Sequence, residues 1–84
     1  MQDALALHET LLGELPAEDR AKRGRLLSDV AWDRIQWVNW NRRYDHPWLA
    51  QAQSEASQAL ELADAPLEQV MASEVLLVAE ALSF

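Results

Sequence analysis

The chain has 84 residues, half of them apolar, and its 14 acidic and seven basic side chains give a net charge of −7 at pH 7. This length allows one domain with a small core, and the apolar content is too high for a disordered tail. The absence of cysteine excludes disulfide frameworks, thiolate chemistry and cysteine-based zinc sites, so the core must hold by packing or by association.

The sequence carries no signal for a membrane or for export. Its longest purely apolar run, residues 75–79, is far shorter than the roughly 20 residues that cross a bilayer. The N-terminal segment has an acid, Asp3, where a signal peptide has Lys or Arg. We therefore expect a cytoplasmic protein that does not associate with membranes.

The charges fall into three blocks. Residues 1–19 carry five acids and no base, residues 20–43 carry seven bases and two acids, and residues 44–84 carry seven acids and no base. This pattern indicates either a basic helix laid between acidic ones or a basic face left free for an acidic partner. We favour the first, because folding brings the acids of the chain within a Debye length of these bases.

Three prolines divide the chain into helices. Pro16, Pro47 and Pro66 each suit the first turn of a helix and push the preceding residue out of the helical region. Glycine is rare and no stretch alternates apolar and polar residues as a strand does. The sequence therefore predicts an all-α protein, a compact bundle of antiparallel helices in a single domain spanning residues 1–84. The predicted helices are residues 3–14, 17–44, 47–63 and 66–82.

The first predicted helix carries leucines on one broad face, with His8 among them. We expect His8 to be a packed residue with one nitrogen satisfied, because no HExxH motif or second histidine at helical spacing accompanies it. The leucines of this face are Leu5, Leu7, Leu11, Leu12 and Leu15.

The second predicted helix has an apolar arc wider than half its circumference, which is typical of a central helix contacted from several sides. Trp32 lies outside the arc and is predicted to be exposed, whereas Arg34 lies inside it. Glu74 is placed in the same way on the fourth helix, so we expect the two charges to pair and fix how these helices dock. The alternative is that one or both bind a partner's charged group. The arc comprises Leu26, Leu27, Val30, Ala31, Ile35, Trp37, Val38, Trp40 and Tyr44.

The last two predicted helices differ in the size of their apolar residues. The third presents a stripe rich in alanine, which lets another helix approach closely. The fourth presents large residues, and Leu76 lies off its stripe. Trp32, Leu76 and Phe84 are thus left over as candidates for an association surface. The fourth stripe comprises Leu67, Val70, Met71, Val75, Leu77, Val78, Ala81 and Leu82.

Residues 52–62, which carry small residues at Ala52, Ala56 and Ala59 before an ALEL sequence, resemble the second helix of a tetratricopeptide repeat that closes with a proline, here Pro66. Upstream, the repeat's Trp, Leu, Gly and Tyr positions are matched by Trp37, Trp40, Asn41 and Tyr44. The chain departs from the repeat in three ways: one residue is missing before Ala52, an asparagine replaces the small residue, and the proline comes late. The resemblance implies antiparallel helical hairpins and a protein-binding role.

We find no catalytic, cofactor or metal motif, so we expect neither an enzyme nor a bound cofactor. The segment Tyr44-Asp45-His46-Pro47 places an acid beside a histidine, which general acid–base catalysis requires. It is more simply a helix boundary at which Asp45 or His46 caps the third helix.

The main functional prediction is a protein–protein interaction module, an adaptor or regulatory subunit, with self-association left open. A second hypothesis is a small acidic inhibitor, such as an antitoxin, an immunity protein or a phage-encoded blocker, that covers a basic nucleic-acid-binding surface. A third is nucleic-acid binding through the Arg- and Trp-rich second helix, which we rank low because the net negative charge repels phosphate. The candidate partner-binding residues are Arg20, Arg23, Trp32, Arg34, Arg42, Arg43, Leu76 and Phe84.

Overall fold

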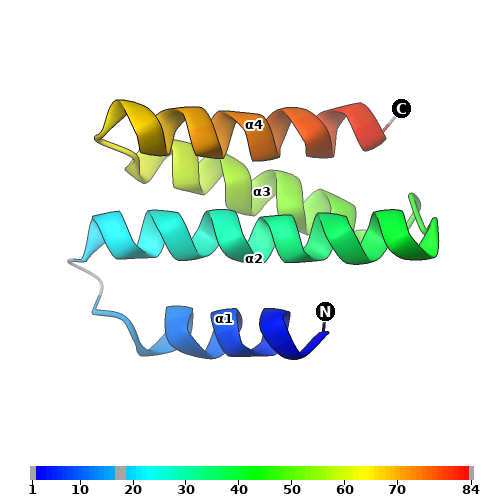
Figure 1. Cartoon of the computed structure of the whole chain (residues 1–84), viewed down its shortest axis with the longest axis horizontal. Coiled ribbons are helices and arrows are strands. Elements are labelled where there is room, and N and C mark those ends of the chain that lie inside the picture. The colour runs from blue at the N-terminus through cyan, green and yellow to red at the C-terminus, as the bar shows by residue number, and fades with distance from the viewer. Residues whose placement is uncertain (1, 17–18, 84) are drawn as a thin grey trace.

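The computed structural model describes residues 2–16 and 19–83, and in these ranges the chain forms four α-helices and no strand. Consecutive helices run antiparallel, and α2 lies between α1 and α4 with α3 behind (Figure 1). The all-α bundle predicted from the sequence is confirmed. None of the described helices combines the length and the apolar character that crossing a membrane requires. The helices are α1 (Gln2–Glu14), α2 (Arg20–Asn41), α3 (Pro47–Leu62) and α4 (Pro66–Leu82).

The central helix, α2, packs against all three others, α3 also packs against α4, and the described residues of α1 pack against α2. The start predicted for α2 falls on residues 17–18, which lie outside the described ranges; the helix begins at Arg20, where the Asp19 carboxylate accepts a hydrogen bond from the Lys22 N–H. It ends at Asn41, before the predicted end at Tyr44. Arg42 takes a left-handed conformation with φ 54°, and the Arg43 N–H bonds back to the Val38 carbonyl at 3.0 Å.

The two later helices begin at prolines, as predicted. Pro47 and Pro66 occupy first-turn positions of α3 and α4. The His46 ring caps α3, because its Nδ1 atom accepts a hydrogen bond of 3.1 Å from the Trp48 N–H. His46 thus acts at the helix boundary predicted from the sequence.

The core lies where α2, α3 and α4 meet, and it is built from aliphatic side chains of α2 packed on alanines. Val30 and Val38 are its largest fully buried side chains. Because alanine side chains are small, the helix axes come close together. The buried alanines are Ala31 on α2, Ala52, Ala56 and Ala59 on α3, Ala63 directly after α3, and Ala72 and Ala79 on α4.

The apolar arc predicted for α2 is wrong at its C-terminal end. Trp40 is 79% exposed and Tyr44 is also exposed. The last turn of α2 reaches beyond the N-terminal end of α1 and the C-terminal end of α4 (Figure 1), so it has less to pack against than the middle of the helix.

The packed face predicted for α4 is also partly wrong. Leu67, Val70, Met71 and Leu77 are exposed, whereas Leu76, predicted to lie off the packed face, packs partly buried against the core. The alanine stripe of α3 packs near Ala72 and Ala79, and this turns inward a side of α4 on which Val75, Leu76, Val78 and Leu82 are partly buried against the core.

The leucine face predicted for α1 is split in the same way. Leu5 is buried and Leu12 partly buried, while Leu7 and Leu11 are exposed. Because the described part of α1 contacts α2 and no other helix, it buries one narrow stripe rather than a broad face.

Candidate protein-binding surface

Among the residues that the structure describes, the buried charged side chain is that of Arg34, which is only 9% exposed. Its Nε donates to the Glu55 carboxylate at 2.8 Å, and its Nη2 donates to the Glu9 carboxylate at 3.1 Å. The guanidinium carbon also lies 5.4 Å from the centre of the Trp48 ring, within the range of a cation–π contact. Arg34 therefore ties α2 to both α1 and α3.

The predicted partner of Arg34 was Glu74, and this pairing is wrong. Glu74 is exposed and lines a hollow on the opposite side of α2, with Trp32 and Val75. The projection correctly placed Arg34 inside the bundle. It did not place α4 relative to the other helices, and α4 turns Glu74 outward.

Glu55 is the more buried of the two carboxylates that accept from Arg34. Burial raises the pKa of Glu55 above its ordinary value, and the hydrogen bond and charge of Arg34 oppose that rise without cancelling it. Burial likewise raises the pKa of the Asp29 carboxyl. Glu55 therefore carries its charge in the folded protein less readily than a free carboxylate does.

A second polar contact joins α1 to α2. The His8 Nδ1 atom lies 2.5 Å from the Asp33 carboxylate, and both side chains are partly buried. This agrees with the prediction that His8 is a packed residue with one satisfied nitrogen. Together with the contact between Glu9 and Arg34, it fixes the rotation of α1 on α2.

The remaining bases of α2 are spread along its surface. Arg25 lies 3.9 Å from Glu68 of α4, Lys22 lies 3.8 Å from Asp19, and the Arg23 guanidinium donates to the Leu15 carbonyl at 3.4 Å. Some bases of α2 thus pair with acids from neighbouring parts of the chain. This agrees with the prediction, made from the charge blocks, that a basic helix lies between acidic ones. Three of the basic sequence candidates are exposed: Arg20, Arg42 and Arg43.

The aromatic residues do not form one platform. Trp37 packs edge-on against His46 and Trp48, with ring centres 4.9 and 4.8 Å away, at the turn between α2 and α3. Trp32 is exposed, as predicted, and lies beside Met71. Phe84 lies outside the described residues.

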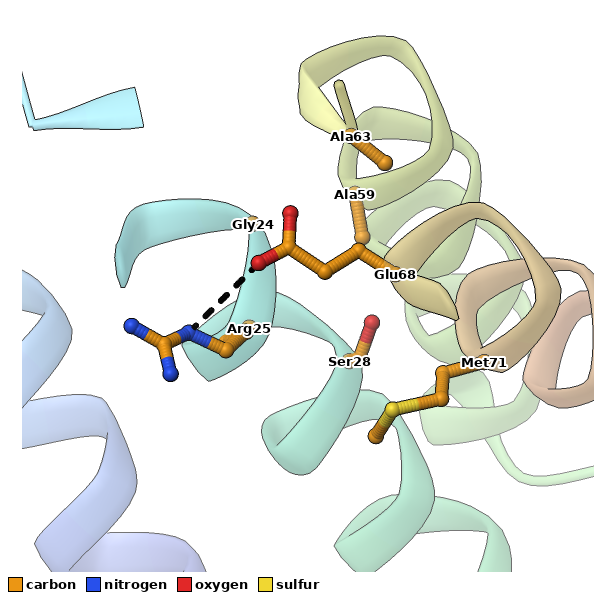
Figure 2. A pocket seen from close by; sticks show the side chains of 7 residues that line it. All are labelled: Gly24, Arg25, Ser28, Ala59, Ala63, Glu68 and Met71. Carbon is orange, nitrogen blue, oxygen red and sulfur yellow. Dashed lines mark ion pairs between the residues drawn. The ribbon is translucent and has the colours of Figure 1, made fainter. Parts of the chain in front are cut away.

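A small, partly open hollow lies between α2, α3 and α4 (Figure 2). The ion pair of Arg25 and Glu68 lies on one side of it and Met71 on another (Figure 2). It has room for about one water molecule, which is far less than a small-molecule ligand needs. The lining residues are Gly24, Arg25, Ser28, Ala59, Ala63, Glu68 and Met71.

Two open grooves lie on either side of the exposed residues of α2 that include Asp29. The groove toward α1 contains Leu11, Leu15 and Leu26, and the groove toward α4 contains Trp32 and Met71. Asp29 belongs to both, so a carboxylate stands on the ridge that separates them. Neither groove gathers a set of groups suited to catalysis.

Several exposed apolar side chains lie together on the side of α4 that points away from the bundle. Leu67 is 71% exposed and Leu77 is 66% exposed, and Val70 between them is also open to solvent. We call this surface, formed by Leu67, Val70, Glu74, Leu77 and Ala81, the outer face of α4. The sequence signal for it was that α4 is apolar almost all round, which leaves a second apolar face once the first is packed.

Comparison of the chain with protein-family models, with curated proteins and with solved structures finds no match.

Proposed function

We propose that this protein is a non-enzymatic protein–protein interaction module, an adaptor or regulatory subunit, which binds its partner through the outer face of α4. The observation that carries the proposal is the exposure of Leu67, Val70 and Leu77 on a helix whose opposite side already packs in the core. Grouped apolar side chains on a soluble surface are characteristic of association sites.

The energetics of this face support the proposal. Burying one exposed leucine or valine side chain gains roughly 1.5–3 kcal/mol before the costs of association are subtracted. Because these three side chains lie on a helix that is already folded, binding through them costs little backbone conformational entropy. The small hollow and the open grooves supply no comparable site for a substrate.

A second candidate, the acidic inhibitor, is supported by the charge of the same half of the molecule. No Lys or Arg occurs between Tyr44 and the C-terminus. Glu61, Asp64, Glu74 and Glu80 are exposed there. An acidic inhibitor loses affinity steeply as salt is raised, whereas an adaptor that binds through apolar residues does not.

Nucleic-acid binding is a third candidate, supported by one observation. Trp40 is largely exposed, and Arg42 and Arg43 follow it in the chain. An aromatic ring beside cations is the arrangement on which single-stranded bases stack. The net charge of −7 opposes it.

The proposal is tested by purifying tagged protein from its native cells at low salt and quantifying the proteins that accompany it. Three baits are compared: wild type, Leu77→Lys and the charge-matched control Ser57→Lys on the solvent side of α3. We expect a partner that wild type and Ser57→Lys retain and that Leu77→Lys loses at least about tenfold. Equal recovery by all three baits contradicts the proposal, and a nuclease-sensitive 260 nm absorbance supports the nucleic-acid alternative.

A further inference from the structure

The outer face of α4 has the spacing of a coiled-coil seam. Its residues are separated alternately by three and four positions, which is the spacing of the a and d positions of a heptad. Ala72 and Ala79, which pack in the core, fall at the f position on the opposite side of the helix. One side of α4 therefore packs inside the bundle, while the opposite side has coiled-coil spacing and is exposed to solvent.

A hollow on this face is lined by residues at the spacing that a coiled-coil hole requires. A knob of one helix enters a hole formed by four residues of the other. On a helix surface such a hole is bounded by residues i, i+3, i+4 and i+7. The hollow is lined by two overlapping sets with this spacing, Pro66, Gln69, Val70 and Ser73, and then Val70, Ser73, Glu74 and Leu77.

Charge decides which helix fits. Glu74 stands at the centre of the seam, Glu80 borders it, and no base occurs on α4. If a second copy paired in parallel, Glu74 would face Glu74 of the other copy, and in either orientation two chains of net charge −7 would be brought together. Like charges at such a position destabilise the pair.

We infer that the outer face of α4 accepts a basic amphipathic helix of a different protein, packed as a two-helix coiled coil, with a Lys or Arg of the partner against Glu74. This inference rests on the proposed function and specifies its partner. The helix α4 is about 25 Å long, so the contact covers about two heptads.

The test uses the full chain and two synthetic three-heptad peptides of about 21 residues. Both have Leu at the other a and d positions; one has Lys and the other Glu at the central a position. Affinities are measured by isothermal titration calorimetry at low salt. We expect the Lys peptide to bind wild type at least about tenfold more tightly than the Glu peptide, and Glu74→Lys to reverse that preference.

Matched controls locate the contact and separate the alternatives. Ser57→Lys, which changes the charge by the same sign away from α4, should leave the peptide preference as in wild type. Equal binding of both peptides to wild type and Glu74→Lys, or unchanged binding to Leu77→Lys, overturns the inference. So does a concentration-dependent dimer in light scattering that Leu77→Lys dissolves, because a second copy is then the occupant.

Failure of the inference is distinguishable from failure of the proposed function. If the peptides do not bind but the native partner is still lost from Leu77→Lys, the interaction role stands and the partner's chemistry is different. If native association is unaffected by Leu77→Lys, the outer face of α4 is not the interaction surface and both fall.

Discussion

The two C-terminal helices carry similar residues on the side that faces the core but differ in polarity on the side that faces solvent. Both α3 and α4 bury alanines, which let them pack closely on α2 and on each other. The outward side of α3 carries polar residues such as Gln51, Ser57 and Gln58, whereas that of α4 carries leucine and valine. Folding accounts for the inner faces of both helices. It does not account for the outer face of α4, which is why we assign that face to binding.

The largest expected effect concerns a contact that α3 makes and α4 does not. Arg34→Ala removes the cation that Glu55 and Glu9 share, leaving a partly buried carboxylate without its partner. We expect a loss of about 2–3 kcal/mol in the free energy of unfolding, measured by urea denaturation. The control Arg43→Ala, at an exposed position, should change stability by less than about 0.5 kcal/mol. A loss for Arg34→Ala as small as that of the control contradicts the structural role.

The next effect tests the close approach of the inner faces. Ala56→Leu places a large side chain at a position with no exposed surface, where α3 packs in the core. Overpacking of this kind costs about 1–3 kcal/mol in the free energy of unfolding. The neighbouring Ser57→Leu adds the same bulk on the solvent side, and its thermal denaturation midpoint should stay close to that of wild type. Equal destabilisation by the two variants contradicts the assigned faces of α3.

A smaller effect on stability is expected on the outer face of α4. Leu77 is mostly exposed, so Leu77→Lys should change the free energy of unfolding by less than about 0.5 kcal/mol while weakening association. Circular dichroism during urea denaturation provides the measurement. Unfolding of this variant under native conditions means that Leu77 is a core residue and that α4 is rotated relative to the structure described.

The smallest effect is the pH dependence due to Glu55. Its pKa is raised in the folded chain from an ordinary value of 4.5, so in the window above 4.5 the folded state binds more protons than the unfolded state. The contribution of Glu55 to stability is therefore full below 4.5 and is lost as the pH rises through the folded pKa. The difference in unfolding free energy between wild type and Glu55→Gln should shift in favour of wild type on acidification from neutral pH. A difference that moves the other way shows that the pKa of Glu55 is lowered in the folded chain.

Features that depend on local geometry could be predicted from the sequence. Prolines set the starts of α3 and α4, His46 marked a cap, and the projection of α2 placed Arg34 inside the bundle. The end of α2 was missed because Arg42 takes a left-handed conformation that glycine more commonly adopts. The role of Glu55 was missed because α3 is mostly polar around it, and only the docked bundle brings it to Arg34.

The orientation of α4 could not be obtained from periodicity. Leu67 and Leu77 are more hydrophobic than the alanines, so any estimate of the apolar face of α4 places them on the packed side. In the structure, however, Ala72 and Ala79 are the buried residues of this helix. What decides the orientation is the fit to the alanine stripe of α3, a property of two helices together. A helix that is apolar on two sides therefore indicates two contacts, and the sequence does not say which is internal.

The most direct measurement of the binding role compares photocrosslinking from the two outward sides. A photoreactive amino acid replaces Leu77 on α4 or Ser57 on α3, and the tagged chains are irradiated in their native cells. We predict a discrete crosslinked product of higher mass from position 77 and none above background from position 57. Products of equal strength from both positions, or none from position 77, would contradict the assignment of the outer face of α4 as the binding surface.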